Sequence, residues 1–376
     1  MPDRTNEDLA TVAGVRVYLK STPFASDTVE VLSGGYANFT FRIRPLRMVH
    51  NRSTFILKYA SPYVAVSAGK MEFDPARQFF EAAALRLFHV SSQNAESALV
   101  TVPVVRLFDR DHHVLIIDDC GGDSCTLKQL LIGESLPMAV SEKIGSELGH
   151  FISQIHSWDV TDPDFSKNEV AKTMSAFVTY GRLVSTLTGE HQIPALQDPL
   201  LGVSEEKLEA ISRVASARHA AILSAKSSDA LTHGDFWPGN IMVCVRRGTD
   251  GAVEDVERLY VLDWELAKAG LPGLDLGQFC AEMHLLSSFH PARKTSTSAV
   301  IESFLSVYKQ SSRADPELAR VALGHIGAHL VAWTPRVSWG GKERTREVVE
   351  EGVDLLLLSS DGSTSALQKS VIGPLF

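Results

Sequence analysis

An aspartate, an asparagine and a second aspartate stand at a spacing suited to phosphoryl transfer. Asp235 and Asn240 lie in one turn-rich stretch, residues 231–240, and Asp263 ends a separate apolar run, residues 259–262. Moving a phosphoryl group to a hydroxyl requires a carboxylate that orients and deprotonates the acceptor, and oxygen ligands that hold Mg²⁺ on the phosphates. The pattern predicts Asp235 as the base, and Asn240 and Asp263 as the metal ligands.

A β-hairpin is the element that would bring the two metal ligands together. The apolar residues 241–245 follow Asn240, and the second apolar run precedes Asp263. Between the two runs lies Asp250-Gly251, a dipeptide typical of tight hairpin turns. Pairing of the runs would place the start of one strand, at Asn240, beside the end of the other, at Asp263.

The motif His233-Gly234-Asp235 with Asn240, followed by Asp263-Trp264-Glu265, resembles the active-site motifs of the aminoglycoside phosphotransferase and choline kinase family. These proteins are protein-kinase-like kinases of small molecules. The resemblance covers about residues 30–350 and implies Mg²⁺ and ATP as cofactors, with GTP left open as an alternative donor. Asp-Trp-Glu stands where protein kinases have Asp-Phe-Gly, so regulation by a Phe flip is not expected. Glu265 is a secondary candidate for the metal site.

The same resemblance implies an α+β, bilobal, protein-kinase-like fold. Residues 1–119 are expected to form a nucleotide-binding lobe, an antiparallel sheet with one main helix. The hinge is expected at about residues 117–124. Residues 120–376 are expected to form a mostly helical lobe that carries the catalytic residues and the acceptor site, with a polar, mobile tail at residues 359–365.

Lys58 is a lone lysine among apolar residues of the expected strand 53–60, where an ammonium without an anion would be costly. In protein-kinase-like folds the corresponding lysine binds the α- and β-phosphates and pairs with a helix glutamate. Glu81 belongs to an amphipathic helical pattern and is the preferred partner. Glu72, beside Asp74-Pro75 in an expected loop, is the second candidate.

Two turn-rich segments complete the expected nucleotide site. Glycine lets the backbone approach phosphate oxygens closely, and the segment 33–38 resembles the glycine-rich loop of these kinases, although Asn38 falls near the position of the third glycine. Its nucleotide-binding candidates are Ser33, Gly34, Gly35 and Asn38. At the hinge, Asp118, Asp119 and Cys120 are expected to contribute backbone groups to the adenine, with one carboxylate capping the turn.

Two further residues are expected to support the loop of residues 233–235, which we call the catalytic loop. Asp275 lies in Leu274-Asp275-Leu276-Gly277, which resembles the Asp-Leu-Gly segment of the family. We expect Asp275 to hold the loop through hydrogen bonds, and His233 to brace it. Ser141 to His156 has apolar residues at helical spacing, and His156 is expected to be structural.

Composition narrows the class of partner. The 376 residues carry a net charge of −9, with 44% hydrophobic and 22% charged residues, which is typical of a globular protein. The negative charge and the lack of basic clusters argue against nucleic acid. No apolar run reaches the length of a membrane span, and the N-terminus lacks the features of a signal peptide, so a cytoplasmic protein is expected. The expected partners are a nucleotide and a small-molecule acceptor.

Two classes of function remain open. The first is an ATP- and Mg²⁺-dependent kinase of a hydroxyl on an aminoglycoside-, amino-alcohol- or sugar-like acceptor. The segments 58–64 and 80–85 also look like the N-lobe of methylthioribose kinases, but those enzymes have a serine in place of Asn240. The second is a pseudokinase-like protein that binds nucleotide without turnover. The presence of Lys58, Asp235, Asn240 and Asp263 together favours catalysis.

Overall fold

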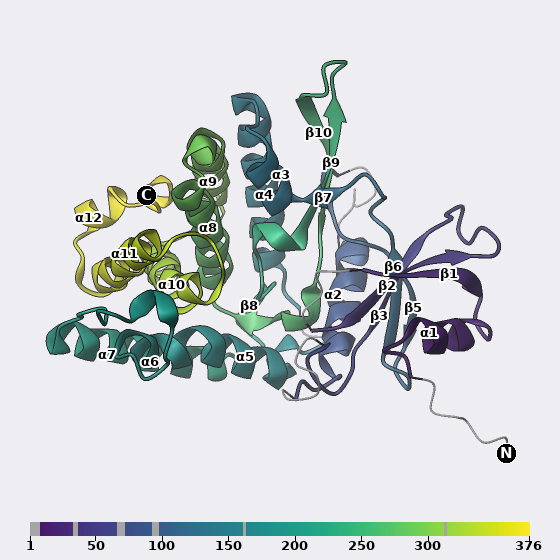
Figure 1. Ribbon diagram of the computed structural model, residues 1–376, viewed down its shortest axis with the longest axis horizontal. Coiled ribbons are helices and arrows are strands. Elements are labelled where there is room, and N and C mark those ends of the chain that lie inside the picture. Colours follow the sequence, from purple (N-terminus) through teal and green to yellow (C-terminus); the bar gives the residue numbers. More distant parts are fainter. Residues whose placement is uncertain (1–7, 33–36, 66–71, 92–97, 161–162, 312–313) are drawn as a thin grey trace. The chain divides into compact units, whose positions relative to one another are not determined.

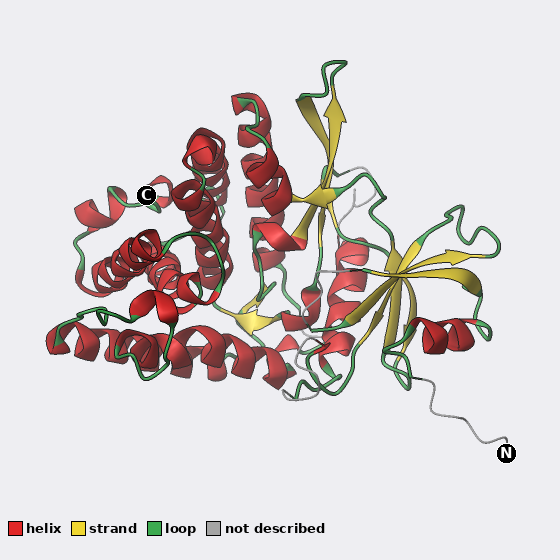
Figure 2. Cartoon of the chain, viewed as in Figure 1, coloured by secondary structure: helices red, strands yellow, loops and turns green. Residues whose placement is uncertain are grey.

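The structure, a computed structural model, describes residues 8–32, 37–65, 72–91, 98–160, 163–311 and 314–376. The chain divides into two compact units, residues 1–124 and 125–376. Strands dominate the first unit and helices the second (Figures 1 and 2). The α+β class, with an antiparallel N-terminal sheet and a helical C-terminal part, is confirmed.

The N-terminal unit is built on an antiparallel sheet with the strand order β1-β2-β3-β6-β5. Its strands are β1 (Ser26–Val31), β2 (Phe39–Pro45), β3 (Phe55–Tyr59), β5 (Val105–Asp109) and β6 (Val114–Asp118); the unit also contains β4 (Val100–Thr101), α1 (Val12–Leu19) and α2 (Arg77–Ser91). The second of these helices begins four residues before Glu81, so Glu81 lies in its second turn.

The two faces of this sheet carry side chains of different character, because successive side chains of a strand point to opposite sides. Leu57 of β3 belongs to an apolar core shared with Tyr18 and Leu19 of α1. Lys58, the next residue, bonds to Glu81 of α2, and the backbone oxygen of Lys58 accepts a hydrogen bond from Gln78 at 3.1 Å. One face therefore stabilises the unit and the other presents charged groups.

The C-terminal unit is a helical assembly. Its helices are α3 (Leu127–Gly133), α4 (Met138–Ser157), α5 (Glu169–Thr179), α6 (Leu183–Leu187), α7 (Glu205–Leu223), α8 (Pro272–Phe289), α9 (Lys294–Tyr308), α10 (Pro316–Ala332), α11 (Lys342–Asp361) and α12 (Thr364–Gln368). Helix α10 is buried at nearly every position from Leu318 to Ala332, as expected for a helix that is apolar all round. It packs against α8 and α11, and α8 carries the residues that hold the catalytic loop.

Three antiparallel strand pairings position the catalytic segments in this unit. Strand β9 (Ile241–Arg247) pairs with β10 (Val253–Val261) and with β7 (Cys125–Thr126), and β8 (Ala230–Thr232) pairs with β11 (Lys268–Gly270). Ile241 faces Val261 at the inner end of the hairpin, and Leu262 N–H donates to the Asn240 oxygen at 2.8 Å. The predicted hairpin is confirmed.

The segment 359–365, for which the sequence predicts a polar and mobile tail, is largely helical. Helix α11 continues to Asp361 and α12 follows from Thr364. Ser359 is buried, and its hydroxyl donates to the Leu356 oxygen at 2.7 Å. The apolar face of α11 holds this polar segment in place. Among the described residues, no helix has both the length and the apolar character that a bilayer span requires.

Gly277 is a point of close approach between α8 and α10. A Cβ there would lie 2.7 Å from the Ala322 oxygen and 2.7 Å from the His325 Cβ. We expect Gly277→Ala to lower the free energy of unfolding by about 1–3 kcal/mol because the helices must separate. Gly133→Ala in α3, where nothing lies within 4 Å, is the matched control and should be nearly neutral. Denaturant titration measures both, and equal effects would contradict the prediction.

Candidate active site

The catalytic loop follows β8 and presents Asp235 through a turn that only glycine fits. Gly234 has φ +83°, and a Cβ there would lie 2.1 Å from the Leu266 oxygen. The Asp235 carboxylate accepts hydrogen bonds from Asn240 Nδ2 at 2.9 Å and from Gln278 Nε2 at 2.6 Å. These two amides fix the orientation of the carboxylate.

Asp275, in the first turn of α8, holds the loop from behind. Its Oδ2 accepts the His233 N–H at 2.7 Å, and its Oδ1 accepts the Gly234 N–H at 2.9 Å. His156 Nε2 also lies 3.1 Å from Oδ2. Burial alone would raise the pKa of Asp275, but the hydrogen bond and charge of His156 outweigh burial and lower that pKa. Asp275 is thus a charged anchor for two consecutive backbone amides.

His233 uses both ring nitrogens inside the loop. Nε2 donates to the Leu262 oxygen at 2.9 Å, and Nδ1 accepts the Asp235 N–H at 3.2 Å. Burial lowers the pKa of His233, so the neutral ring is favoured. The imidazole ties the catalytic loop to the end of β10, and both nitrogens are engaged in that role.

Asn240 and Asp263 lie at the inner end of the hairpin, where the sequence predicts the metal ligands. Asp263 adopts a left-handed backbone conformation, φ 65°, at the end of β10. Burial, together with the negative charges of Asp263 and Glu265, raises the pKa of Asp235 to about 7. A divalent cation would offset this repulsion, and carboxylate and amide oxygens are the donors that Mg²⁺ prefers. The residues present therefore fit a magnesium ion.

In the N-terminal unit, the ammonium of Lys58 donates to Glu81, and both side chains are buried. Glu72 is exposed and forms a β-bridge with Tyr63 instead. Asn38 is buried, and its Oδ1 accepts a hydrogen bond from Arg77 at 2.9 Å. Ser33, Gly34 and Gly35, the other expected loop contacts, lie outside the described residues.

The two carboxylates of the expected hinge segment pair with arginines. Asp118 pairs with Arg106 at 2.7 Å and with Arg52 at 3.2 Å. Asp119 pairs with Arg42 at 2.7 Å and accepts the Gly121 N–H at 3.0 Å, which caps the turn. Cys120 follows Asp119 and is partly buried. Contact of this segment with a nucleotide base through backbone groups remains a prediction.

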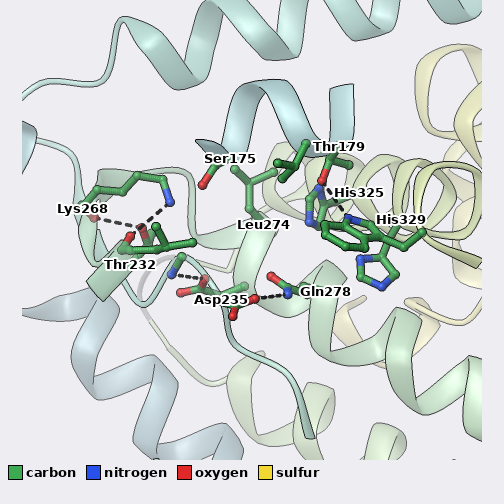
Figure 3. Close-up of a pocket in the computed structure, with 14 residues that line it drawn as sticks. Ser175, Thr179, Thr232, Asp235, Lys268, Leu274, Gln278, His325 and His329 are labelled. Atoms are coloured by element: carbon green, nitrogen blue, oxygen red, sulfur yellow. Dashed lines mark hydrogen bonds between the residues drawn. The ribbon is translucent and has the colours of Figure 1, made fainter. Parts of the chain in front are cut away.

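A pocket opens beside Asp235 within the C-terminal unit (Figure 3). Its walls come from α5, the catalytic loop, β11, α8 and α10, and its lining residues are Ser175, Val178, Thr179, Thr232, Gly234, Asp235, Leu266, Lys268, Leu274, Asp275, Gln278, His325, His329 and Trp333. The Ser175 hydroxyl is buried, and the described residues offer it no hydrogen-bond partner. A buried polar atom of this kind suits a bound molecule or water.

Lys268 and Gln278 are site residues that the sequence analysis missed. Lys268 is 2% exposed, and its ammonium lies 3.4 Å from the Leu266 oxygen. The ion pairs among the described residues do not include it. Its signal in the sequence is the one that marked Lys58, a single lysine in an apolar strand. Gln278 follows Asp275 by three positions, so both lie on one face of α8.

Glu282, one turn along α8 from Gln278, lies beside a cluster of aromatic rings. We call Trp237, Trp339 and Glu282 the cation cage. Lys128 of α3 occupies it. The Lys128 ammonium lies 3.0 Å from Glu282 Oε2, 3.9 Å from the Trp339 ring centroid and 5.0 Å from that of Trp237. Cations bind such rings through the negative face of the π system.

An oriented carboxylate beside a pocket, with further carboxylate and amide oxygens next to it, is the arrangement expected of a kinase of small molecules. The chain belongs to the phosphotransferase enzyme family, whose model matches residues 28–320. The protein-kinase-like fold that the sequence predicts is the fold of this family, and kinases of this kind use a nucleotide, a divalent metal and a small-molecule acceptor.

Known proteins resemble this chain along much of its length. A 4-hydroxytryptamine kinase of Psilocybe cubensis is 29% identical over 357 residues, 92% of each chain. A methylthioribose kinase of Exiguobacterium sibiricum is 28% identical over 276 residues, 70% of this chain and 62% of the relative. The crystal structure of a choline/ethanolamine kinase family protein from Mesorhizobium loti aligns over 96% of this chain and 97% of that one, with 15% identity and a TM-score of 0.46.

We expect Asp275→Asn to lower the free energy of unfolding by about 2–4 kcal/mol, because an amide group would replace an acceptor that two buried N–H groups need. The folded pKa of Asp275 lies below its ordinary 3.8, so its charge stabilises the fold above that pH and the benefit is lost as pH falls through the folded pKa. Denaturant titration at pH 7 and below pH 3.8 should show the difference between wild type and variant shrink. Asp354→Asn, an exposed carboxylate, is the control; a constant difference would refute the anchor role.

Lys268→Met tests whether the buried ammonium serves the acceptor pocket. Burial lowers the pKa of Lys268 to about 8, below its ordinary value of 10.5. At pH 7 the charged ammonium therefore costs the folded state free energy, and this cost disappears as pH rises from about 8 to about 10.5. We expect the variant to be at least as stable as wild type at pH 7, and more than tenfold lower in kcat/KM. Thermal unfolding and steady-state kinetics measure the two effects. Lower stability with unchanged kinetics would assign Lys268 to the fold alone.

Proposed function

We propose that this enzyme transfers the γ-phosphoryl group of ATP to a hydroxyl group of an amine-bearing small molecule, with Mg²⁺ as the metal. The observation that carries the choice of acceptor is the cation cage. It holds an ammonium beside Glu282, four residues along α8 from Gln278, which itself bonds to Asp235. A hydroxyl at Asp235 and an ammonium at the cage would therefore lie within one small molecule.

In the proposed reaction Asp235 accepts the proton of the acceptor hydroxyl while the oxygen of that hydroxyl forms a bond to the γ-phosphorus. The bond from that phosphorus to the bridging oxygen breaks, and ADP leaves with the electron pair. Asn240 and Gln278 hold the carboxylate in place, and a pKa near 7 suits a base that works at neutral pH. Bound Mg²⁺, held by Asn240 and Asp263, would neutralise phosphate charge, and Lys58 would bind the phosphates from the N-terminal unit.

The relatives support this choice of acceptor. The 4-hydroxytryptamine kinase is named for a hydroxyl compound with an amino group, and it matches the chain over nearly its whole length. The sugar alternative, phosphorylation of a methylthioribose-like acceptor, has matches that cover only 62% of the relative. The other alternative, a protein that binds nucleotide without turnover, predicts no ADP release with any acceptor.

The test is an ADP-release assay with Mg-ATP and, in parallel, Mg-GTP. The acceptors are 4-hydroxytryptamine, choline, ethanolamine, an aminoglycoside and methylthioribose. We expect turnover with an amine-bearing acceptor, and a loss of at least a hundredfold in Asp235→Asn. The variant should remain folded because the charge of Asp235 is disfavoured by burial.

Asp255→Asn is the matched control for this assay, since it makes the same chemical change in a carboxylate that pairs with Lys143 on the protein surface. It should retain wild-type turnover. Turnover with methylthioribose alone would favour the sugar alternative. Full activity in Asp235→Asn would remove Asp235 from the reaction.

A further inference from the structure

The cation cage is built from side chains that the fold holds in place. Glu282 is 7% exposed, and its Oε1 accepts a hydrogen bond from His329 Nε2 at 2.9 Å. Trp339 stacks on Phe289, with ring centroids 5.7 Å apart and planes inclined by 20°. Trp237 follows the base by two residues and continues into the turn Pro238–Asn240. The carboxylate and both rings are therefore positioned before any ligand arrives.

The occupant of the cage is the movable part. Lys128 is the second residue of the short helix α3, and its side chain is 21% exposed. Four methylene groups separate its ammonium from the backbone, so the ammonium can reach solvent by side-chain rotation alone. Its charge is already matched by Glu282, which leaves little positive potential to attract an anionic ligand.

The distance from the cage to the base suits a small molecule. Gln278 and Glu282 are four residues apart on α8, which corresponds to about 6 Å along the helix axis. Gln278 donates to Asp235, and Glu282 binds the ammonium. An ammonium and a hydroxyl a few bonds apart on one acceptor would span these two points.

We propose that Lys128 is a built-in competitor, whose ammonium fills the cation cage until the ammonium of the acceptor displaces it. The proposal rests on the amine-bearing acceptor of the proposed function. Two ammonium groups at one carboxylate repel each other, so binding of the acceptor ammonium and of Lys128 in the cage is mutually exclusive. Neutral hydroxyl compounds cannot replace the lost ion pair and ring contacts, and they meet a filled cage. Lys128 thereby selects acceptors that carry a cation.

The test measures binding without turnover. The probe is tryptamine, which carries an ammonium and has no hydroxyl to phosphorylate, and indole is its uncharged counterpart. Calorimetric titration of the full chain should show that Lys128→Met binds tryptamine about fivefold or more tightly than wild type, because the competing cation is gone. Glu282→Gln should bind it at least tenfold more weakly. Lys207→Met, which removes a lysine paired at 3.0 Å with Asp354, is the matched control and should leave the affinity unchanged.

The sign of the Lys128→Met effect decides the question. Weaker tryptamine binding in this variant, no change, or an equal gain for indole would overturn the competitor role, as would the absence of tryptamine binding in all variants. Phosphoryl transfer is not part of the measurement. The two proposals can therefore fail separately. If no acceptor gives ADP release but Lys128→Met binds tryptamine more tightly than wild type, the kinase reaction is contradicted and the competitor role of Lys128 is retained.

Discussion

The geometry of the active site depends on one buried carboxylate that accepts two consecutive backbone N–H groups. Asp275 fixes the His233 and Gly234 amides, and through them it sets the direction in which Asp235 leaves the loop. Because α8 also supplies Gln278 and Glu282, a single helix anchors the loop, orients Asp235 and carries the acid of the cation cage. These three interactions are tied to one helix, and its packing against α10 limits how far any of them can move.

Much of this arrangement follows from rules that act over short stretches of chain. The Asp250-Gly251 turn and its flanking apolar runs predict the hairpin, and strand pairing then brings Asn240 and Asp263 to its inner end. The same holds for Lys58, because an ammonium in an apolar strand demands an anion, and the helical register of residues 77–91 supplies Glu81. The segment around Asp275 was expected to hydrogen-bond the loop, and the two amide contacts show how it does so. The chemical roles of these residues stay predictions.

The rest depends on helices that meet only in the folded chain. The pocket joins Ser175 of α5, Lys268 of β11 and His329 of α10, and no local periodicity reports that these elements adjoin. The cage has the same origin, since Lys128 and Trp339 are more than two hundred residues apart. The helical structure of the tail has a related origin. Residues 359–365 are polar in composition, yet the buried face of α11 keeps Ser359 in a helix.

The hairpin of β9 and β10 has two ends with opposite tolerance for change. At the inner end, the Asn240 backbone oxygen accepts the Leu262 N–H and the Asn240 side chain donates to Asp235. A register slip of one residue would therefore turn Asn240 and Asp263 to the other face of the hairpin. The outer end closes through Gly248 to Gly251, and irregular pairing along β10 already absorbs extra residues there. Insertions and deletions can therefore accumulate at the outer end of the hairpin during evolution, while the arrangement of residues at its inner end is preserved.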